Sequence, residues 1–176
     1  AIIGTGGIGH DVAELLTSAP GESQTAEEFL KAWGVDPTLR SAGGLQASVT
    51  RGAQRKVVML QRGTKKPGAR LGKSTGWIHR TKLTKRGVTA VSGCTYEKID
   101  DQGLHITITK GEQSEQRVLD VDHVVVCAGQ ESVNSLYDAL KDNAAFKTHL
   151  VGGAEYAGEL DAKRAIRKAS ELASAL

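Results

Sequence analysis

The sequence has only two cysteines, few aromatic residues and no long apolar run. Cys94 and Cys127 are too few and too far apart to frame a small disulfide-stapled fold or a four-thiolate metal site, and no close pair such as Cys-x-x-Cys occurs. No apolar run approaches the roughly 20 residues that span a bilayer, and no basic stretch precedes the first apolar residues, as in a secretory signal. We therefore expect a cytoplasmic protein without a membrane partner.

The size and composition indicate a globular protein with one main domain and a smaller appended part. The chain has 176 residues, of which 39% are hydrophobic and 24% are charged. It begins at Ala1, without a methionine and directly on an apolar segment. We interpret it as a piece of a longer protein.

The apolar pattern of the first half predicts strands and helices in alternation. Residues 1–4 are an apolar run into glycine and residues 8–16 have helical spacing, so the chain opens with a strand, a glycine turn and a helix. Thr25 and Glu28 form a capping-box pattern that predicts a short helix over 26–33. No convincing period follows until the next expected elements, which are a buried strand at 56–61, a helix at 75–86 and a strand at 88–91.

The second half first changes in character and then returns to the earlier pattern. Three short strands, at 96–99, 104–108 and 118–121, are joined by polar turns and predict an antiparallel meander. A buried strand over 124–129 resumes the sheet. The remaining expected elements are a helix at 133–142, a short strand at 148–151 and an amphipathic helix at 160–176. The fold class that we predict is α/β: a Rossmann-like parallel sheet with helices and an inserted antiparallel β-meander.

The first turn has the pattern Gly-x-Gly-x-x-Gly between a predicted strand and a predicted helix. The first glycine suits a tight turn, the second lets backbone approach a pyrophosphate, and the third lets helix and strand pack closely. The amides at the start of the helix would face the phosphates. The alternative is a glycine-rich turn without a ligand. The candidate dinucleotide-binding residues here are Gly4, Gly6, Gly7, Ile8 and Gly9.

The end of the second strand indicates which dinucleotide would bind. NAD-binding domains usually have an acidic residue at this place, which binds the ribose hydroxyls. Here the strand ends in Gln61 and Arg62, without a carboxylate. An arginine suits a 2′-phosphate, so NADPH is favoured over NADH. Lys65 and Lys66 in the following loop would add to this contact.

The charge is concentrated around the same place. Between residues 51 and 86 there are 12 Lys or Arg and no acidic residue, whereas the rest has 11 basic and 20 acidic residues. Most of these side chains have a plain alternative interpretation as a solvated cationic face. A nucleic-acid partner is another alternative, but aromatics make up only 4% of the chain and no nucleic-acid-binding motif accompanies the charge.

Several segments resemble a known family. They are the glycine turn, Val-Met-Leu-Gln-Arg at 58–62, Lys-Pro-Gly at 66–68, Leu-Gly-Lys-Ser-Thr-Gly-Trp-Ile-His-Arg at 71–80, Val-Val-Cys-Ala-Gly-Gln-Glu at 125–131, His-Leu-Val-Gly-Gly at 149–153 and Glu-Leu-Asp-Ala-Lys-Arg-Ala-Ile at 159–166. Together they resemble the C-terminal part of the bacterial NADPH-dependent 2,4-dienoyl-CoA reductases. The resemblance covers nearly the whole chain.

The resemblance implies a modular flavoprotein. In that family a (β/α)₈ barrel holds FMN and the acyl-CoA, a cysteine cluster holds a [4Fe–4S] centre, and a two-part FAD domain encloses the NADPH domain. Residues 1–128 would be the NADP(H)-binding domain and residues 129–176 the last segment of the FAD domain, with the other domains of the parent chain as partners. We expect no catalytic residue and no metal ligand in this chain, which would be inactive alone.

The resemblance also implies further cofactor contacts. Ala128 and Gly129 match the place where such reductases let a dinucleotide pass close to backbone. Gly152 and Gly153 align with a segment that commonly holds the FAD ribityl chain through a Gly-Asp pair, but the aspartate is missing here. Amides near Leu160 would face the flavin. We therefore expect only a partial FAD site, with weak or no binding in the isolated chain.

The remaining candidates and hypotheses are less specific. We expect His79 to be a structural hydrogen-bonding residue, and His10 to lie beside the phosphates without reacting. The leading hypothesis is an NADPH-binding module of an oxidoreductase. The alternatives are a nucleotide-responsive or FAD-only module without a redox role, and a basic nucleic-acid-binding domain.

Overall fold

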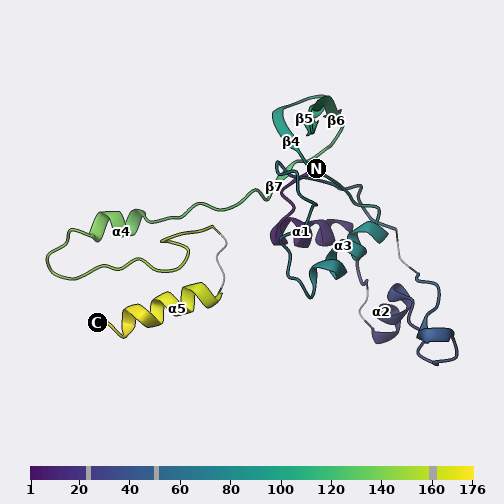
Figure 1. Cartoon of the computed structure of the whole chain (residues 1–176), viewed down its shortest axis with the longest axis horizontal. Coiled ribbons are helices and arrows are strands. Elements are labelled where there is room, and N and C mark those ends of the chain that lie inside the picture. The colour runs from purple at the N-terminus through teal and green to yellow at the C-terminus, as the bar shows by residue number, and fades with distance from the viewer. Residues whose placement is uncertain (23–24, 50–51, 159–161) are drawn as a thin grey trace. The chain divides into compact units, whose positions relative to one another are not determined.

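The computed structural model describes residues 1–22, 25–49, 52–158 and 162–176 (Figure 1). These residues divide into two compact units, Ala1–Ala128 and Gly129–Leu176. Unit 1 contains β1 (Ile2–Ile3), α1 (Gly7–Thr17), α2 (Ala26–Trp33), the short 3₁₀ helix η1 (Ala42–Gly44), β2 (Val58–Leu60), α3 (Gly76–Lys85), β3 (Thr89–Val91), β4 (Cys94–Asp100), β5 (Gly103–Lys110), β6 (Gln113–Leu119) and β7 (Val125–Val126). Unit 2 contains α4 (Ser135–Leu140) and α5 (Ala162–Ala173).

A four-stranded parallel sheet forms the centre of unit 1. Its strand order is β3-β2-β1-β7, with Ile2 in register with Met59 on one side and with Val125 on the other. The chain leaves β1 through α1 and leaves β2 through α3, as the alternating pattern predicts. A separate three-stranded antiparallel sheet, β4-β5-β6, lies between β3 and β7 in the sequence. The predicted fold class is confirmed.

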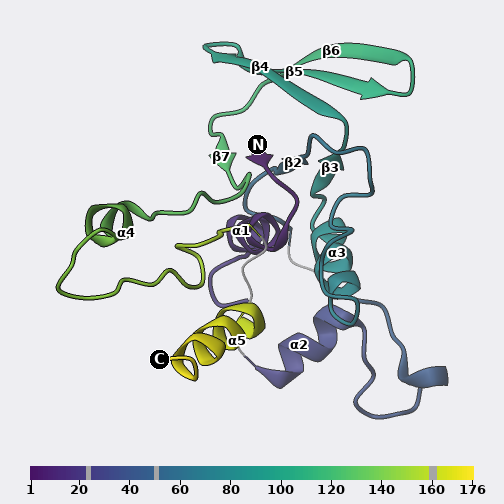
Figure 2. The ribbon, with the colours of Figure 1, turned by 60° about the vertical axis from the view of Figure 1, so that its left-hand side comes forward.

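The parallel sheet has a different cover on each face. Successive side chains of a strand point to opposite faces, so the two residues of β1 enter two separate cores. Ile3 packs with Leu60 and the meander residue Leu104, whereas Ile2 packs with Ala13 of α1 and Leu83 of α3. Figure 2 shows the strands in a row between the meander and these helices. Because both faces are covered, the central strands are apolar throughout.

The meander differs from its prediction in the third strand. The predicted strand at 118–121 is observed as β6, which begins at Gln113 and ends at Leu119. Its residues are mostly exposed, so its side chains carry no alternating signal. Backbone pairing with β5 over the whole of β6 holds the strand instead. A strand whose side chains are exposed on both faces cannot be predicted from the alternation of apolar and polar residues.

The segment between α1 and β2 folds around two polar contacts. The predicted capping box is confirmed: the Thr25 side chain accepts from the Glu28 amide, and the Glu28 carboxylate accepts from the Thr25 amide. Helix α2 is followed by the C-cap residue Gly34, whose backbone is left-handed. Beyond it, the buried Asp36 carboxylate accepts four hydrogen bonds, from the Thr38 amide and hydroxyl and from the amides of residues 40 and 41.

Unit 2 corrects several predicted boundaries. The expected strand at 148–151 is wrong, because these residues form no strand and no strand occurs among the described residues of unit 2. A short strand needs a neighbour to satisfy its backbone groups, and none is available there. The two helices are confirmed with shorter bounds. None of the helices within the described ranges is long and apolar enough to cross a bilayer.

The last strand of the parallel sheet is also shorter than predicted. Only Val125 and Val126 pair with β1, and the Val126 side chain is 71% exposed. The expectation of a buried strand over 124–129 is therefore wrong for part of this segment. As an edge strand, β7 has a neighbour on one side only.

Ion pairs join α1 to α3 on the helical face of the sheet. Glu14 accepts from Lys82 Nζ and pairs with His79 Nδ1, each at 2.7 Å. Burial by itself raises the pKa of Glu14, but the hydrogen bonds from Lys82 and His79 outweigh it, and the pKa lies below its ordinary value. The expected structural role of His79 is confirmed.

Arg86, directly after α3, closes the same contact at the C-terminus of α1. Its side chain is only 5% exposed and donates to the carbonyl of Glu14 at 3.1 Å and the hydroxyl of Ser18 at 3.1 Å. It also donates to Glu22 Oε1 at 2.6 Å. A cation at a helix C-terminus satisfies orphan carbonyls and complements the helix dipole.

We expect Arg86→Met to lower the free energy of unfolding by about 2 to 3 kcal/mol, because it removes the buried guanidinium that donates to Glu22 and to the last turn of α1. Lys82→Met is the matched control: its side chain is 39% exposed, and its loss should cost less than about 1 kcal/mol. Urea unfolding followed by circular dichroism measures both. Equal costs for the two variants would contradict the capping role of Arg86.

Candidate dinucleotide-binding loop

The glycine loop, defined as Gly4–Gly9, is the crossing point of β1, α1 and β7. A Cβ on Gly4 would lie 2.2 Å from the carbonyl oxygen of Cys127, and Gly4 has φ +120°, which disfavours any other residue. A Cβ on Gly9 would lie 2.1 Å from the carbonyl oxygen of Gly4. Two of the three motif glycines are therefore required by backbone contacts within the fold.

The middle of the loop is open instead. A Cβ on Gly6 or Gly7 would meet nothing within 4 Å, so this backbone faces free space. Gly6 is the N-cap of α1 and receives no side-chain capping bond, so the first amides of the helix have no partner from a cap. The exposed Ile8 continues the same turn. An uncovered helix N-terminus behind a tight glycine turn is the arrangement that fits a pyrophosphate.

The residue after β2 connects the glycine loop to the basic loop, defined as residues 62–66. Gln61 Oε1 accepts a hydrogen bond from the hydroxyl of Thr5, and Gln61 Nε2 donates to the carbonyls of Gly63, at 3.0 Å, and Lys65. Thr5 is buried within the glycine loop. The amino-acid pattern indicates only that Gln61 is not acidic, and it contains no signal for this link.

The three predicted cations of the basic loop are exposed. Arg62, Lys65 and Lys66 all lie at the surface, and Arg62 makes no ion pair with any residue that the structure describes. Burial and the neighbouring Cys94 raise the pKa of Tyr96 to about 12, while the positive charge of Arg62 opposes this rise. Arg62 is therefore a solvated cation beside a protonated phenol, with its donors available for an anion.

Gly68, two residues after the basic loop, is held in place by His10 and Arg80. The buried His10 ring contacts the carbonyl of Gly6 through Nδ1 at 3.0 Å, and a Cβ on Gly68 would lie 3.0 Å from the same ring. Arg80 Nη1 donates to the carbonyl of Gly68 at 3.0 Å. His10 therefore lies beside the glycine loop, and its place beside the phosphates stays a prediction. The sequence-based prediction missed the role of Gly68. Its φ is +70°, and a glycine in a loop often marks such a left-handed backbone position.

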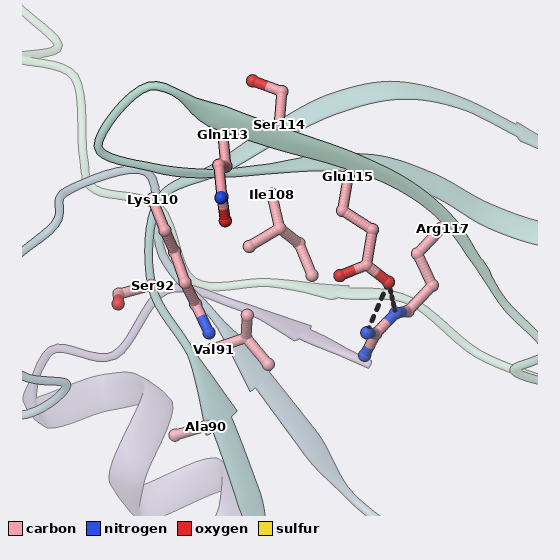
Figure 3. A pocket seen from close by; sticks show the side chains of 9 residues that line it. All are labelled: Ala90, Val91, Ser92, Ile108, Lys110, Gln113, Ser114, Glu115 and Arg117. Atoms are coloured by element: carbon pink, nitrogen blue, oxygen red, sulfur yellow. Dashed lines mark hydrogen bonds and ion pairs between the residues drawn. The ribbon is translucent and has the colours of Figure 1, made fainter.

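Two pockets lie outside the glycine loop. One, of about 540 Å³, lies between β3 and the β5–β6 hairpin, and its Arg117 is paired with Glu115 (Figure 3). None of the predicted cofactor residues lines it. The other, of about 530 Å³, runs along α3 and includes His10 and Lys66. The second pocket therefore borders the basic loop, whereas the first belongs to the meander.

The family of the chain follows from its sequence. The model of the pyridine nucleotide-disulphide oxidoreductase family matches residues 1–150. The chain belongs to this family. Membership implies binding of FAD and NAD(P)H, and it agrees with the open glycine loop of unit 1.

Three solved structures match most of this chain, and the first of them shares its fold. A 2-naphthoyl-CoA reductase in complex with 2-naphthoyl-CoA has 17% identity and a TM-score of 0.57, over 88% of this chain and 18% of that one. An NAD-dependent persulfide reductase from A. fulgidus has 20% identity and a TM-score of 0.41, over 78% of this chain and 18% of that one. An engineered water-forming NADPH oxidase bound to NADPH has 18% identity and a TM-score of 0.38, over 78% and 22%. This chain thus spans about a fifth of each.

The other predicted cofactor residues of this family member fall in different places. Ala128 is the last residue of unit 1, and Gly129, with φ +126°, is the first of unit 2. Gly152 is left-handed, with φ +66°, and its carbonyl accepts from the amide of Tyr156 in a turn that contains Gly153. Leu160 lies outside the described residues. The structure thus brings the glycine loop and the basic loop together, within unit 1.

The cysteines do not provide the disulfide of the family name. Cys94 and Cys127 are both free. Cys94 is buried, which raises the pKa of its thiol. In the described part of the chain, no group of three or more His, Cys, Asp or Glu side chains is arranged to hold a metal ion.

We expect Gly9→Ala to destabilise the protein by about 2 to 3 kcal/mol, because its Cβ would collide with the backbone at Gly4. Gly7→Ala is the matched control in the same helical turn. It has free space and should be neutral or stabilising by up to about 1 kcal/mol, as Gly→Ala usually is within a helix. Thermal unfolding of both variants measures the difference. A stabilising Gly9→Ala would show that the loop is looser than described.

Proposed function

We propose that residues 1–128 form an NADPH-binding module of a flavoprotein oxidoreductase, and that residues 129–176 are a segment of its split FAD-binding domain. The observation that carries the proposal is the open backbone of Gly6 and Gly7 at the start of α1, linked through Gln61 to the loop that carries the exposed cation of Arg62. This arrangement offers one place for a pyrophosphate and another for a 2′-phosphate.

Each group of the module has a separate task. The amides of Gly7 and Ile8, together with the positive end of α1, bind the pyrophosphate. Arg62, with help from Lys65 and Lys66, binds the 2′-phosphate through charge-assisted hydrogen bonds. When bound, NADPH supplies a hydride to a flavin, and the protein orients it.

The resemblance to the dienoyl-CoA reductases supports a finer proposal for the parent protein. Electrons would pass from NADPH to FAD, then through a [4Fe–4S] centre to FMN and an unsaturated acyl-CoA. The fold shared with a 2-naphthoyl-CoA reductase, which also acts on a coenzyme A thioester, is consistent with this substrate class. The groups that reduce the thioester would lie in the other domains, so we assign no catalytic residue to this chain.

The proposed FAD segment is incomplete by itself. Gly152 and Gly153 offer backbone groups only, since Gly153 takes the place of the aspartate in the Gly-Asp pair. We therefore place FAD binding in the parent protein and derive no step through FAD here.

We expect Arg62→Ala to weaken NADPH binding about ten- to hundredfold and to change NADH binding by less than about threefold, since only NADPH has the 2′-phosphate. Lys73→Ala removes one exposed charge from the same basic stretch and is the control for a general field effect. Isothermal titration of the chain with each dinucleotide measures both. Unchanged NADPH affinity in Arg62→Ala would exclude Arg62 as the anchor of the 2′-phosphate. If the unaltered chain bound neither dinucleotide, the proposed function would be refuted.

We expect Gly6→Ala to weaken NADPH and NADH binding by the same factor, because its methyl group would enter the space of the pyrophosphate that they share. The free energy of unfolding should fall by less than about 1 kcal/mol, since alanine is only a poorer N-cap than glycine. Titration together with thermal unfolding separates the two effects. A loss confined to NADPH would place the pyrophosphate elsewhere.

A further inference from the structure

We propose that Gln61 is a positioning residue that couples the glycine loop to the basic loop and thereby sets the preference for NADPH over NADH. This inference rests on the proposed function, because it concerns the same dinucleotide site. It adds a residue that contacts neither phosphate but determines how the two phosphate sites are placed relative to each other.

The backbone of Gln61 is fixed on both sides. Its amide donates to the carbonyl of Val91, at the end of β3, at 2.9 Å, and its carbonyl accepts from the amide of Cys94, at the start of β4, at 3.0 Å. These bonds continue the parallel sheet by one residue beyond β2 and join it to the meander. The side chain of Gln61 therefore starts from a rigid position.

The side-chain amide of Gln61 uses its acceptor and its donors for three different bonds. The oxygen accepts from the hydroxyl of Thr5, and the nitrogen donates to the carbonyls of Gly63 and Lys65. Glutamine is suited to this because it has an acceptor and two donors on one long side chain. A carboxylate would accept from Thr5 but would have no donor for the two carbonyls.

These bonds explain how an uncharged residue disfavours NADH. An acidic residue at this place would offer free oxygens to the ribose hydroxyls of NAD. In Gln61 the acceptor oxygen is uncharged and already accepts from the Thr5 hydroxyl, and the two donors hold the basic loop through its backbone. With their carbonyls tied to Gln61, residues 63 and 65 have a fixed backbone position, and the side chains of Arg62 and Lys65 remain exposed.

The test compares two variants that break the link from opposite ends. Gln61→Met removes all three bonds without adding charge, and Thr5→Val removes only the bond between the loops with a side chain of the same shape. We expect Gln61→Met to lower the ratio of NADPH to NADH affinity about tenfold and Thr5→Val to lower it by less, about threefold. In the double variant the losses should not add, because both substitutions break the same link.

The matched control is Gln46→Met. Gln46 Nε2 also donates to a backbone carbonyl, that of Val35 at 2.6 Å, but it lies in the segment between α1 and β2. Its substitution should leave the affinity ratio unchanged. Thermal unfolding shows whether each variant is folded, and Thr5→Val carries the test if Gln61→Met is not.

The outcomes separate this inference from the proposed function. Equal weakening of NADPH and NADH binding in Gln61→Met would indicate a purely structural role and overturn the inference, as would an unchanged ratio in both variants. If the unaltered chain bound neither dinucleotide, the proposed function itself would fail. If the unaltered chain prefers NADPH and the variants lose this preference, the result supports both the proposed function and the inference about Gln61.

Discussion

The close approach of backbone to backbone in the glycine loop is the constraint on which the rest of the structure depends. Gly9 lies against the carbonyl of Gly4, and Gly4 lies against the carbonyl of Cys127, at distances that leave no room for a Cβ. This crossing brings the start of α1 to the ends of β1 and β7. The same geometry leaves Gly6 and Gly7 uncovered, so the packing within the fold and the open backbone at the start of α1 have one cause.

The charges around this crossing divide into two groups with different roles. Arg86 and Lys82 are paired and hold α1 against α3, and Arg80 holds the carbonyl of Gly68. Arg62 and Lys65 are exposed on a loop whose backbone is tied to Gln61. A basic stretch of sequence therefore has a structural part and a part that is available to an anion. Counting charges does not distinguish the two, because the distinction depends on contacts far apart in sequence.

The sequence predicted those parts of the fold that are buried or capped. Met59 and Leu60 are apolar because both faces of the sheet are covered, and Thr25 with Glu28 forms a local cap, so both patterns are readable in order along the chain. The third meander strand was misplaced because its residues face solvent and backbone pairing alone holds it. The strand expected at 148–151 has apolar residues but no partner in unit 2.

The candidate site was predictable in its local motif and not in its long-range links. The glycine spacing is a local signal, and its consequences for Gly4, Gly6 and Gly9 follow from it. The hydrogen bond from Thr5 to Gln61 joins residues 56 positions apart, and no pattern along the chain indicates it. Because of that bond, the glutamine in place of the carboxylate after β2 has a structural contact of its own. In our proposal it is part of how NADPH is selected, because the glutamine that replaces the carboxylate positions the loop that carries Arg62.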